Sequence, residues 1–188
     1  MMNFLYRIFL KLHTSYQEWI GHVYIEACKS RGLKVGKGVI FIEAPRFGSE
    51  PYLIEIGDRT KITAGCTFIN HDGAMYTIRS MEKYKDVRNF GRIRLGKNCF
   101  VGNNCTFLPG AQMGDNCILG AGSVLNSSMP ANTVFAGVPA KYICTIEEYG
   151  DKALQNNIMY PRNLEKERPK LDAYIRENLP DVYKPVKK

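Results

Sequence analysis

Apolar residues recur at every sixth position through the middle of the chain, and this spacing is the strongest pattern in the sequence. The longest series comprises Leu95, Val101, Phe107, Met113, Leu119 and Leu125. Two shorter series comprise Ile56, Ile62 and Phe68, and Val35, Phe41 and Phe47. Glycine directly follows many of these positions. A period of six fits neither an α-helix nor a long strand, so the pattern predicts short strands joined by glycine-containing turns.

Three such units make one coil of 18 residues, and the series divide the chain into four coils. These coils are predicted over residues 35–52, 56–73, 95–112 and 113–130. Three residues separate the first two coils, and a long inserted loop over 70–92 precedes the third. Stacked repeats of this kind bury a continuous interior. The sequence therefore predicts a mainly β fold, a parallel β-helix whose domain spans residues 33–144.

Four of the six cysteines occupy one phase of the repeat, which indicates packing rather than chemistry. Each follows an apolar anchor by four residues, and the set comprises Cys66, Cys99, Cys105 and Cys117. Other small residues share this phase, namely Thr60, Ala111 and Ser123. Because thiols pack as small hydrophobes, we expect this phase to face the interior of the coils. Reduced thiols also agree with a cytoplasmic location.

The segments on either side of the coils are predicted to be helical. Residues 1–32 contain a stripe with helical spacing, comprising Phe4, Ile8, Leu12, Trp19, Val23 and Ala27. Ser15 and Glu18 have the spacing of a capping box, which predicts a break near His13. We expect this segment to bury its stripe and to cap the open end of the β-helix. Residues 145–188 are predicted to form a polar helical extension.

The chain is basic, with 26 Lys and Arg against 18 Asp and Glu and a formal charge of +8. Because no zinc-finger spacing or RNA-binding motif accompanies the cations, we expect no nucleic-acid partner. An alternative role for the N-terminal segment is weak contact of Arg7 and Lys11 with a membrane surface. No apolar run is long enough to cross a bilayer, so a cytoplasmic location is the default expectation.

Of the three histidines, only His71 lies in the coil region, where the repeat breaks off into the inserted loop. Loops that project from rigid scaffolds are favoured places for catalysis. A neutral imidazole can act as a general base and remove the proton of a hydroxyl that acts as a nucleophile. A neighbouring acceptor must fix the tautomer of such a ring. Asp72 is a candidate for that role or for binding the acceptor substrate, and a turn-forming role before Gly73 is an equal alternative.

The inserted loop also carries a cluster of cations with one aromatic residue, including Arg79 and Tyr76. One interpretation is an arm that binds the acceptor substrate, with Asp72, Tyr76 and Arg79 in contact with it. The other is a solvated surface loop. Glu50, which lies before Pro51 at the end of the first predicted coil, is a further residue that could reach the acceptor, but it is not assigned a role.

Three features together resemble one known family: the hexapeptide repeat, the His-Asp-Gly loop at His71 and the Gly-Val-Pro-Ala-Lys ending at 137–141. They resemble the hexapeptide-repeat acyltransferase superfamily, and in particular its sugar O-acetyltransferases. The resemblance implies a left-handed parallel β-helix, a homotrimer with active sites between neighbouring coils, and acetyl-CoA as acyl donor without a metal. It also implies that His71 is the general base.

The resemblance further implies a binding site for acetyl-CoA. Backbone groups at Gly102 and Asn103, and at Ala121 and Gly122 one coil later, match positions that contact pantetheine in the family. Lys141 matches the cation near the phosphates. One departure is that Asn126 and Ser127 stand where many relatives have Thr-Lys, so one expected cation is missing here.

We therefore expect an acetyl-CoA-dependent O-acetyltransferase that acts on a hydroxyl of a sugar or surface-polysaccharide precursor. N-acetylation of an amino sugar is an alternative within the same fold. A non-catalytic trimeric scaffold is the alternative outside enzymes. A zinc carbonic anhydrase on this fold is set aside, because it needs three histidine ligands and the coil region holds only His71.

Overall fold

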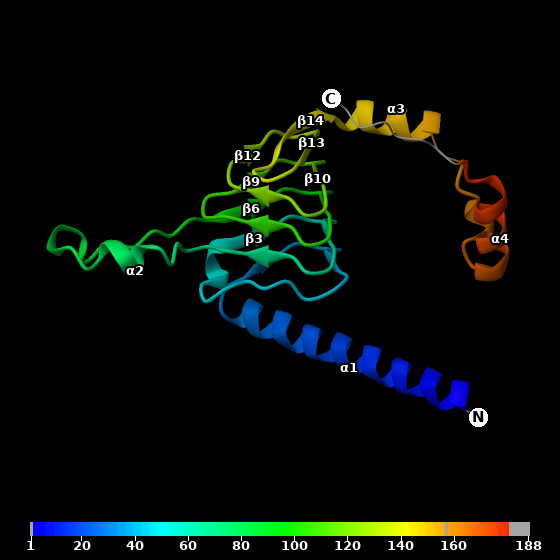
Figure 1. The fold of residues 1–188 in the computed structure, drawn as a ribbon, viewed down its shortest axis with the longest axis horizontal. Coiled ribbons are helices and arrows are strands. Elements are labelled where there is room, and N and C mark those ends of the chain that lie inside the picture. The colour runs from blue at the N-terminus through cyan, green and yellow to red at the C-terminus, as the bar shows by residue number, and fades with distance from the viewer. Residues whose placement is uncertain (1, 157, 181–188) are drawn as a thin grey trace. The chain divides into compact units, whose positions relative to one another are not determined.

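The computed structural model describes residues 2–156 and 158–180 and folds the middle of the chain into three parallel sheets around one interior (Figure 1). Sheet A contains Lys34–Val35 (β1), Ile54–Ile56 (β3), Ile93–Leu95 (β6), Gln112–Met113 (β9) and Ser128–Met129 (β12). Sheet B contains Ile40–Phe41 (β2), Lys61–Ile62 (β4), Phe100–Val101 (β7), Ile118–Leu119 (β10), Thr133–Ala136 (β13) and Lys141–Thr145 (β14). Sheet C contains Thr67–Phe68 (β5), Thr106–Phe107 (β8) and Val124–Leu125 (β11).

The second, third and fourth predicted coils each contribute a strand to every sheet, and the first coil adds β1 and β2 and an isolated bridge from Arg46 to Thr67 of β5, so the parallel β-helix is confirmed. In the later coils the register advances by 18 residues, as in the pairing of Leu95 with Met113. Between the first two coils it advances by 21, as in the pairing of Val35 with Ile56. The extra residues form the 3-10 helix η1 (Pro51–Leu53). The stack also continues past residue 130, where the fourth predicted coil ends, because β13 and β14 add to sheet B.

The interior consists of the six-residue anchors and the small-residue phase between them. The buried anchors are Phe47, Ile56, Ile62, Phe68, Leu95, Val101, Phe107, Met113, Leu119 and Leu125. The four cysteines of the small-residue phase are buried as predicted, and their thiols donate to backbone carbonyls of the following coil. Cys105 Sγ lies 3.1 Å from the oxygen of Gly120, and Cys99 Sγ lies 3.1 Å from that of Gly114. This phase therefore contributes packing and hydrogen bonds that join successive coils.

Residues 70–92 form an arm that projects from the coils between β5 and β6 (Figure 1). The arm contains the short helix Met75–Ile78 (α2) and the 3-10 helix Glu82–Tyr84 (η2). Its two ends pair in antiparallel fashion through His71 and Phe90. The amide of Gly91 also donates to the oxygen of Asn70 at 2.9 Å. These contacts fix the base of the arm against the rigid coils.

The N-terminal segment forms one helix, Met2–Ser30 (α1), so the predicted break near His13 is wrong. Only its last turns contact the coils, where Ile25 and Cys28 are buried and Tyr24 stacks on Phe47. The stripe that we expected to be buried lies exposed at Ile8, Leu12, Trp19, Val23 and Ala27. The expectation fails because the face that reaches the coils is a different one, and the side chain of Phe4 lies outside the described residues.

Residues 145–188 form a separate compact unit, of which 157 and 181–188 lie outside the described residues. It contains Ile146–Asn156 (α3), the 3-10 helix Arg162–Leu164 (η3) and Arg168–Asn178 (α4), as the predicted helical extension requires. A reciprocal capping box begins α3, because Thr145 Oγ1 accepts from the amide of Glu148 and Glu148 Oε2 accepts from that of Thr145. Across both described ranges, no helix combines the length and apolar character that a membrane crossing needs.

Candidate active site

His71 lies where the second coil leaves sheet C and the arm begins. Its backbone is held by the antiparallel bridge to Phe90, and its ring meets the Phe90 ring edge-on with centroids 6.1 Å apart. The imidazole remains 44% exposed. A rigid backbone with an accessible ring is the arrangement that a general base requires.

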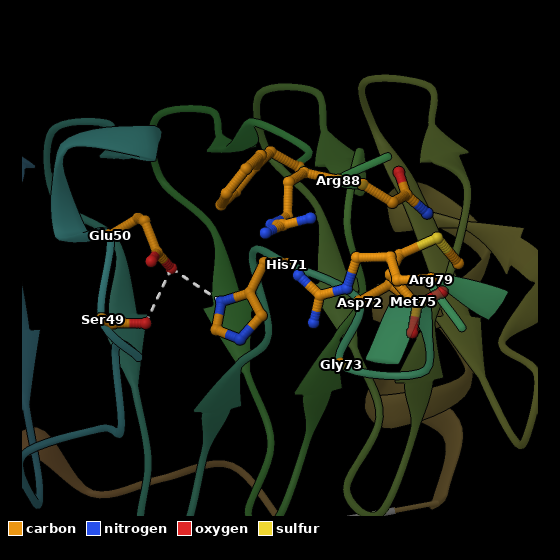
Figure 2. A pocket seen from close by; sticks show the side chains of 10 residues that line it. Ser49, Glu50, His71, Asp72, Gly73, Met75, Arg79 and Arg88 are labelled. Carbon is orange, nitrogen blue, oxygen red and sulfur yellow. Dashed lines mark hydrogen bonds and ion pairs between the residues drawn. The ribbon is translucent and has the colours of Figure 1, made fainter. Parts of the chain in front are cut away.

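A carboxylate holds one nitrogen of this ring. Glu50 Oε2 lies 2.7 Å from His71 Nδ1, and the same oxygen accepts from Ser49 Oγ at 2.9 Å (Figure 2). An ionised carboxylate only accepts hydrogen bonds, so Nδ1 carries the proton and the lone pair of a neutral ring lies on Nε2. Glu50 is therefore the hydrogen-bond acceptor that fixes the tautomer of the His71 ring. Asp72 was the candidate for this role from the sequence.

The environment of Glu50 keeps its carboxyl ionised. Burial of the side chain opposes ionisation and is the largest single influence, but the hydrogen bonds from His71 and Ser49 and the charges of His71 and Arg31 together outweigh it. The net result is that the pKa of Glu50 lies below its ordinary value. The side chain is 18% exposed, which limits the access of water to the contact.

Asn70 positions the segment that carries Glu50. Its side chain is buried, and Nδ2 donates to the backbone oxygens of Glu50 at 2.7 Å and Phe47 at 3.3 Å. One amide thereby ties the residue before His71 to the end of the first coil. The geometry of the Glu50 and His71 pair is thus set by the end of the first coil together with the base of the arm.

The sequence interpretation missed Glu50 as the partner of His71, although the repeat contains the signal. Pairs between the first two coils are offset by 21 residues, as for Val35 with Ile56 and Arg46 with Thr67. Glu50 and His71 have the same offset of 21. Counting this register along the first coil would have placed the carboxylate beside the imidazole.

A cavity of about 290 Å³ opens beside His71. It is lined by Ser49, Glu50, His71, Asp72, Gly73, Met75, Arg79, Arg88, Asn89 and Phe90. Figure 2 shows the side chains of Arg79 and Arg88 directed toward the ring from the arm, across from Glu50. The cavity therefore offers two guanidinium groups beside a candidate base.

Two of the three residues predicted to bind the acceptor substrate line the cavity, and the third is exposed to solvent. Arg79 and Asp72 line the cavity, and Asp72 Oδ1 also accepts from the amide of Ala74 at 2.9 Å, which is the turn-forming role. Tyr76 is 80% exposed and does not line the cavity. Arg88, which the prediction did not single out, takes a place there instead.

The residues that match CoA-binding positions lie together at another corner of the coils. An added Cβ on Gly102 would lie 2.5 Å from the nitrogen of Ala121, so the two corners stack with no space for a side chain between them. The amide of Gly122 donates to the oxygen of Asn103 at 2.7 Å. This corner precedes sheet C, whereas His71 follows sheet C.

Lys141 begins β14 and its side chain is exposed. The segment before it runs beside the fourth coil, since the amide of Ala140 donates to the oxygen of Val124 at 2.8 Å. Val124 in turn donates to the oxygen of Gly137 at 3.0 Å. The Gly-Val-Pro-Ala-Lys ending is thus fixed next to the coil that carries Ala121 and Gly122.

A metal site does not emerge from the described part of the chain. Residues 2–156 and 158–180 contain no group of three or more His, Cys, Asp or Glu side chains that could hold an ion. The four interior cysteines donate to backbone carbonyls instead, as described above.

Comparison with known proteins gives matches along most of this fold. Residues 92–127 match the bacterial transferase hexapeptide family, described by six repeats. The chain is 45% identical to protein CapG of Staphylococcus aureus over 127 residues, which is 66% of this chain and 73% of CapG. It is 30% identical to the galactoside O-acetyltransferase of Escherichia coli K12 over 99 residues, 53% of this chain and 47% of that protein.

Among solved structures, a hexapeptide-repeat-containing acetyltransferase from Vibrio cholerae matches with a TM-score of 0.50. The match covers 63% of this chain and 77% of that chain at 17% identity. At this identity the likeness concerns the fold alone.

Proposed function

Because the chain belongs to the hexapeptide-repeat acyltransferase superfamily, and so is an acyltransferase built on a left-handed parallel β-helix, we propose that it acetylates a hydroxyl group of a carbohydrate. The donor in this proposal is acetyl-CoA, and the acceptor is a sugar or a surface-polysaccharide precursor. The observation that carries the proposal is the hydrogen bond between Glu50 and His71 at the mouth of the cavity. The partial match to a galactoside O-acetyltransferase supports a carbohydrate as acceptor.

His71 acts as the general base in this mechanism. Its Nε2 takes the proton of the acceptor hydroxyl while the hydroxyl oxygen attacks the thioester carbonyl. A C–O bond forms, the C–S bond breaks, and CoA leaves as a thiolate that takes up the proton from the imidazolium. The carboxylate of Glu50 stabilises the imidazolium while it exists and keeps the ring in the productive tautomer. Glu50 is therefore a positioning residue.

Acetyl-CoA is assigned to the stacked corner described above. Backbone groups of Gly102, Asn103, Ala121 and Gly122 would contact the pantetheine, and Lys141 would pair with the phosphates. This corner and His71 lie at opposite ends of the strands of sheet C. We therefore place the complete site between two chains of a homotrimer, with the base from one chain and the donor corner from its neighbour.

The acceptor is assigned to the cavity on the arm side of His71. Arg79 and Asp72 line this cavity and would hydrogen-bond to the hydroxyl groups or a charged group of a sugar. Tyr76 projects from the same arm and would contact the acceptor only from outside the cavity. Arg88 adds a second guanidinium group, which favours an acceptor that carries a negative charge.

The proposed function is tested by measuring CoA release with a panel of sugars, followed by mass spectrometry of the products. We expect His71→Ala to lower kcat by roughly 10²- to 10⁴-fold while acetyl-CoA binding is retained, since only the proton transfer is removed. His22→Ala changes an exposed histidine of α1 and serves as the control. Unchanged turnover in His71→Ala would exclude this mechanism, and base-stable acetylation would indicate an amide rather than an ester.

A further inference from the structure

The long helix α1 presents a broad apolar face that is left exposed by the described residues of its own unit, 2–144. Five side chains on this face are each more than half exposed: Leu5 60%, Phe9 65%, Leu12 66%, Tyr16 55% and Trp19 61%. They are spaced by four and three residues in turn, so they lie along one side of the helix. Tyr6, Ile8 and Ile20 flank this line and are exposed as well.

The coils cannot cover this face, because α1 contacts them with its other side. An added Cβ on Gly21 would lie 3.3 Å from Ala44 Cβ of the first coil, and Ile25 and Cys28 are buried there. At 3.6 residues per turn, these contact residues lie about half a turn around the helix from Leu12 and Trp19. The docking of α1 therefore directs its apolar face away from the β-helix.

The charges and the aromatic residues of this helix indicate what would cover the face. The charged residues before Glu18 are Arg7 and Lys11, both on the polar side of the helix, and the whole chain carries a formal charge of +8. Tyrosine and tryptophan are enriched where a protein meets the interface between lipid and water. Cations beside such a face add attraction to anionic lipid headgroups.

We propose that residues 5–24 of α1 lie flat on an anionic membrane surface, with the face of Leu12 and Trp19 inserted among the lipid headgroups and first acyl carbons. Arg7 and Lys11 remain at headgroup level and pair with lipid phosphates or carboxylates. The last turns keep the helix docked on the first coil through Ile25 and Cys28. The catalytic domain would thereby be held at the membrane by a peripheral anchor.

A second copy of the chain is the competing occupant of this face, because spacings of four and three residues also occur in coiled coils. The pattern covers fewer than the three to four heptads that such an assembly usually needs. The flanking positions hold Tyr6, Ile8 and Ile20 rather than the charged pairs that set coiled-coil partners. A wide apolar face with aromatic residues fits a lipid surface better than a narrow helix seam.

The experiment measures cosedimentation of the full chain with vesicles of phosphatidylcholine, alone or mixed with phosphatidylglycerol. We expect binding to the anionic vesicles, weaker binding to the neutral ones, and release at high salt. Leu12→Gln with Trp19→Gln should reduce binding at least tenfold, because two buried side chains are lost. Thr14→Gln places the same new residue on the polar side of the helix, between Arg7 and Lys11 on one side and the coil contact on the other, and should bind like the parent chain.

Arg7→Gln with Lys11→Gln separates the electrostatic contribution from the apolar one. We expect a loss of roughly fivefold for each cation on anionic vesicles, and little change on neutral vesicles. Circular dichroism and the subunit number from light scattering accompany every variant. The proposal is overturned if the parent chain binds neither vesicle. It is also overturned if Leu12→Gln with Trp19→Gln lowers the subunit number while vesicle binding stays unchanged.

Discussion

The smallest unit that matters for activity is the contact between Glu50 and His71. The sequence placed His71 at the junction of coil and arm, because the repeat ends there, and the structure has it at that position. It did not assign Glu50, whose neighbours in the sequence, Ser49 and Pro51, carry no motif. Glu50 can be identified as the partner of His71 only when the offset of 21 residues between the first two coils is applied.

Replacing Glu50 should separate catalysis from donor binding. In Glu50→Gln the amide can still contact Nδ1, but it no longer fixes the tautomer or stabilises the imidazolium. We expect kcat to fall about tenfold to 100-fold, with the KM for acetyl-CoA unchanged. Steady-state kinetics measure both values, and Glu43→Gln, an exposed carboxylate of the same coil, is the control. Turnover equal to that of the parent chain would remove Glu50 from the mechanism.

The same carboxylate should affect stability in a pH-dependent way. Its pKa in the folded chain lies below the ordinary value of 4.5, since the hydrogen bonds from His71 and Ser49 and the charges of His71 and Arg31 together outweigh the effect of burial. Ionised Glu50 therefore contributes fully to the free energy of unfolding at pH values above its ordinary pKa of 4.5. This contribution is lost as the pH falls through the lower pKa that Glu50 has in the folded chain. We expect the difference in free energy of unfolding between the parent chain and Glu50→Gln to shrink between about pH 7 and about pH 3. Urea unfolding measures it, and a constant difference would contradict the assignment.

At the scale of the elements, the stability of the short strands depends on the packing of the interior that they enclose. Phe107 of β8 stacks on Phe68 of β5 with ring centroids 4.6 Å apart, and both side chains are fully buried. We expect Phe107→Ala to lower the free energy of unfolding by about 3–5 kcal/mol, because the rigid coils cannot collapse into the space. Phe100→Ala on the neighbouring strand β7 removes a 41% exposed ring and should cost less than half as much. Equal losses in denaturant unfolding would argue against a single shared interior.

The elements also show where sequence patterns succeed and fail. The six-residue spacing was sufficient to predict the anchors from Ile56 to Leu125, because only an interior position explains an apolar residue in every unit. The stripe of α1 failed as a predictor of burial, because periodicity identifies a face without saying what covers it. Ile25 and Cys28, which do reach the coils, lie outside that stripe. The break expected at Ser15 and Glu18 failed because the helix continues through the capping pattern.

At the scale of the whole molecule, the proposed site requires two chains, and mixed assemblies can test this. His71→Ala removes the base, whereas Ala121→Tyr fills the donor corner with a bulky ring at an exposed position. If the base and the corner come from different chains, coassembled inactive variants should regain activity at roughly a quarter of their interfaces. If each chain carries a complete site, the mixture should stay inactive. CoA release before and after coassembly distinguishes the two outcomes.

The residues inserted between the first two coils set the alignment across the site. With Pro51–Leu53 in place, Glu50 and His71 share an offset of 21, and removing three residues would restore the common spacing of 18. The apolar anchors would then keep the same partners, and Glu50 would still lie opposite His71 in the register. The turn directly after Glu50 would be lost, however, in which the amide of Leu53 donates to the oxygen of Glu50 at 3.0 Å, so the carboxylate would lose its orientation toward the imidazole. Lineages of this protein should therefore tolerate length changes in the arm more readily than in this short bridge, where a deletion would silence the enzyme before it unfolded it.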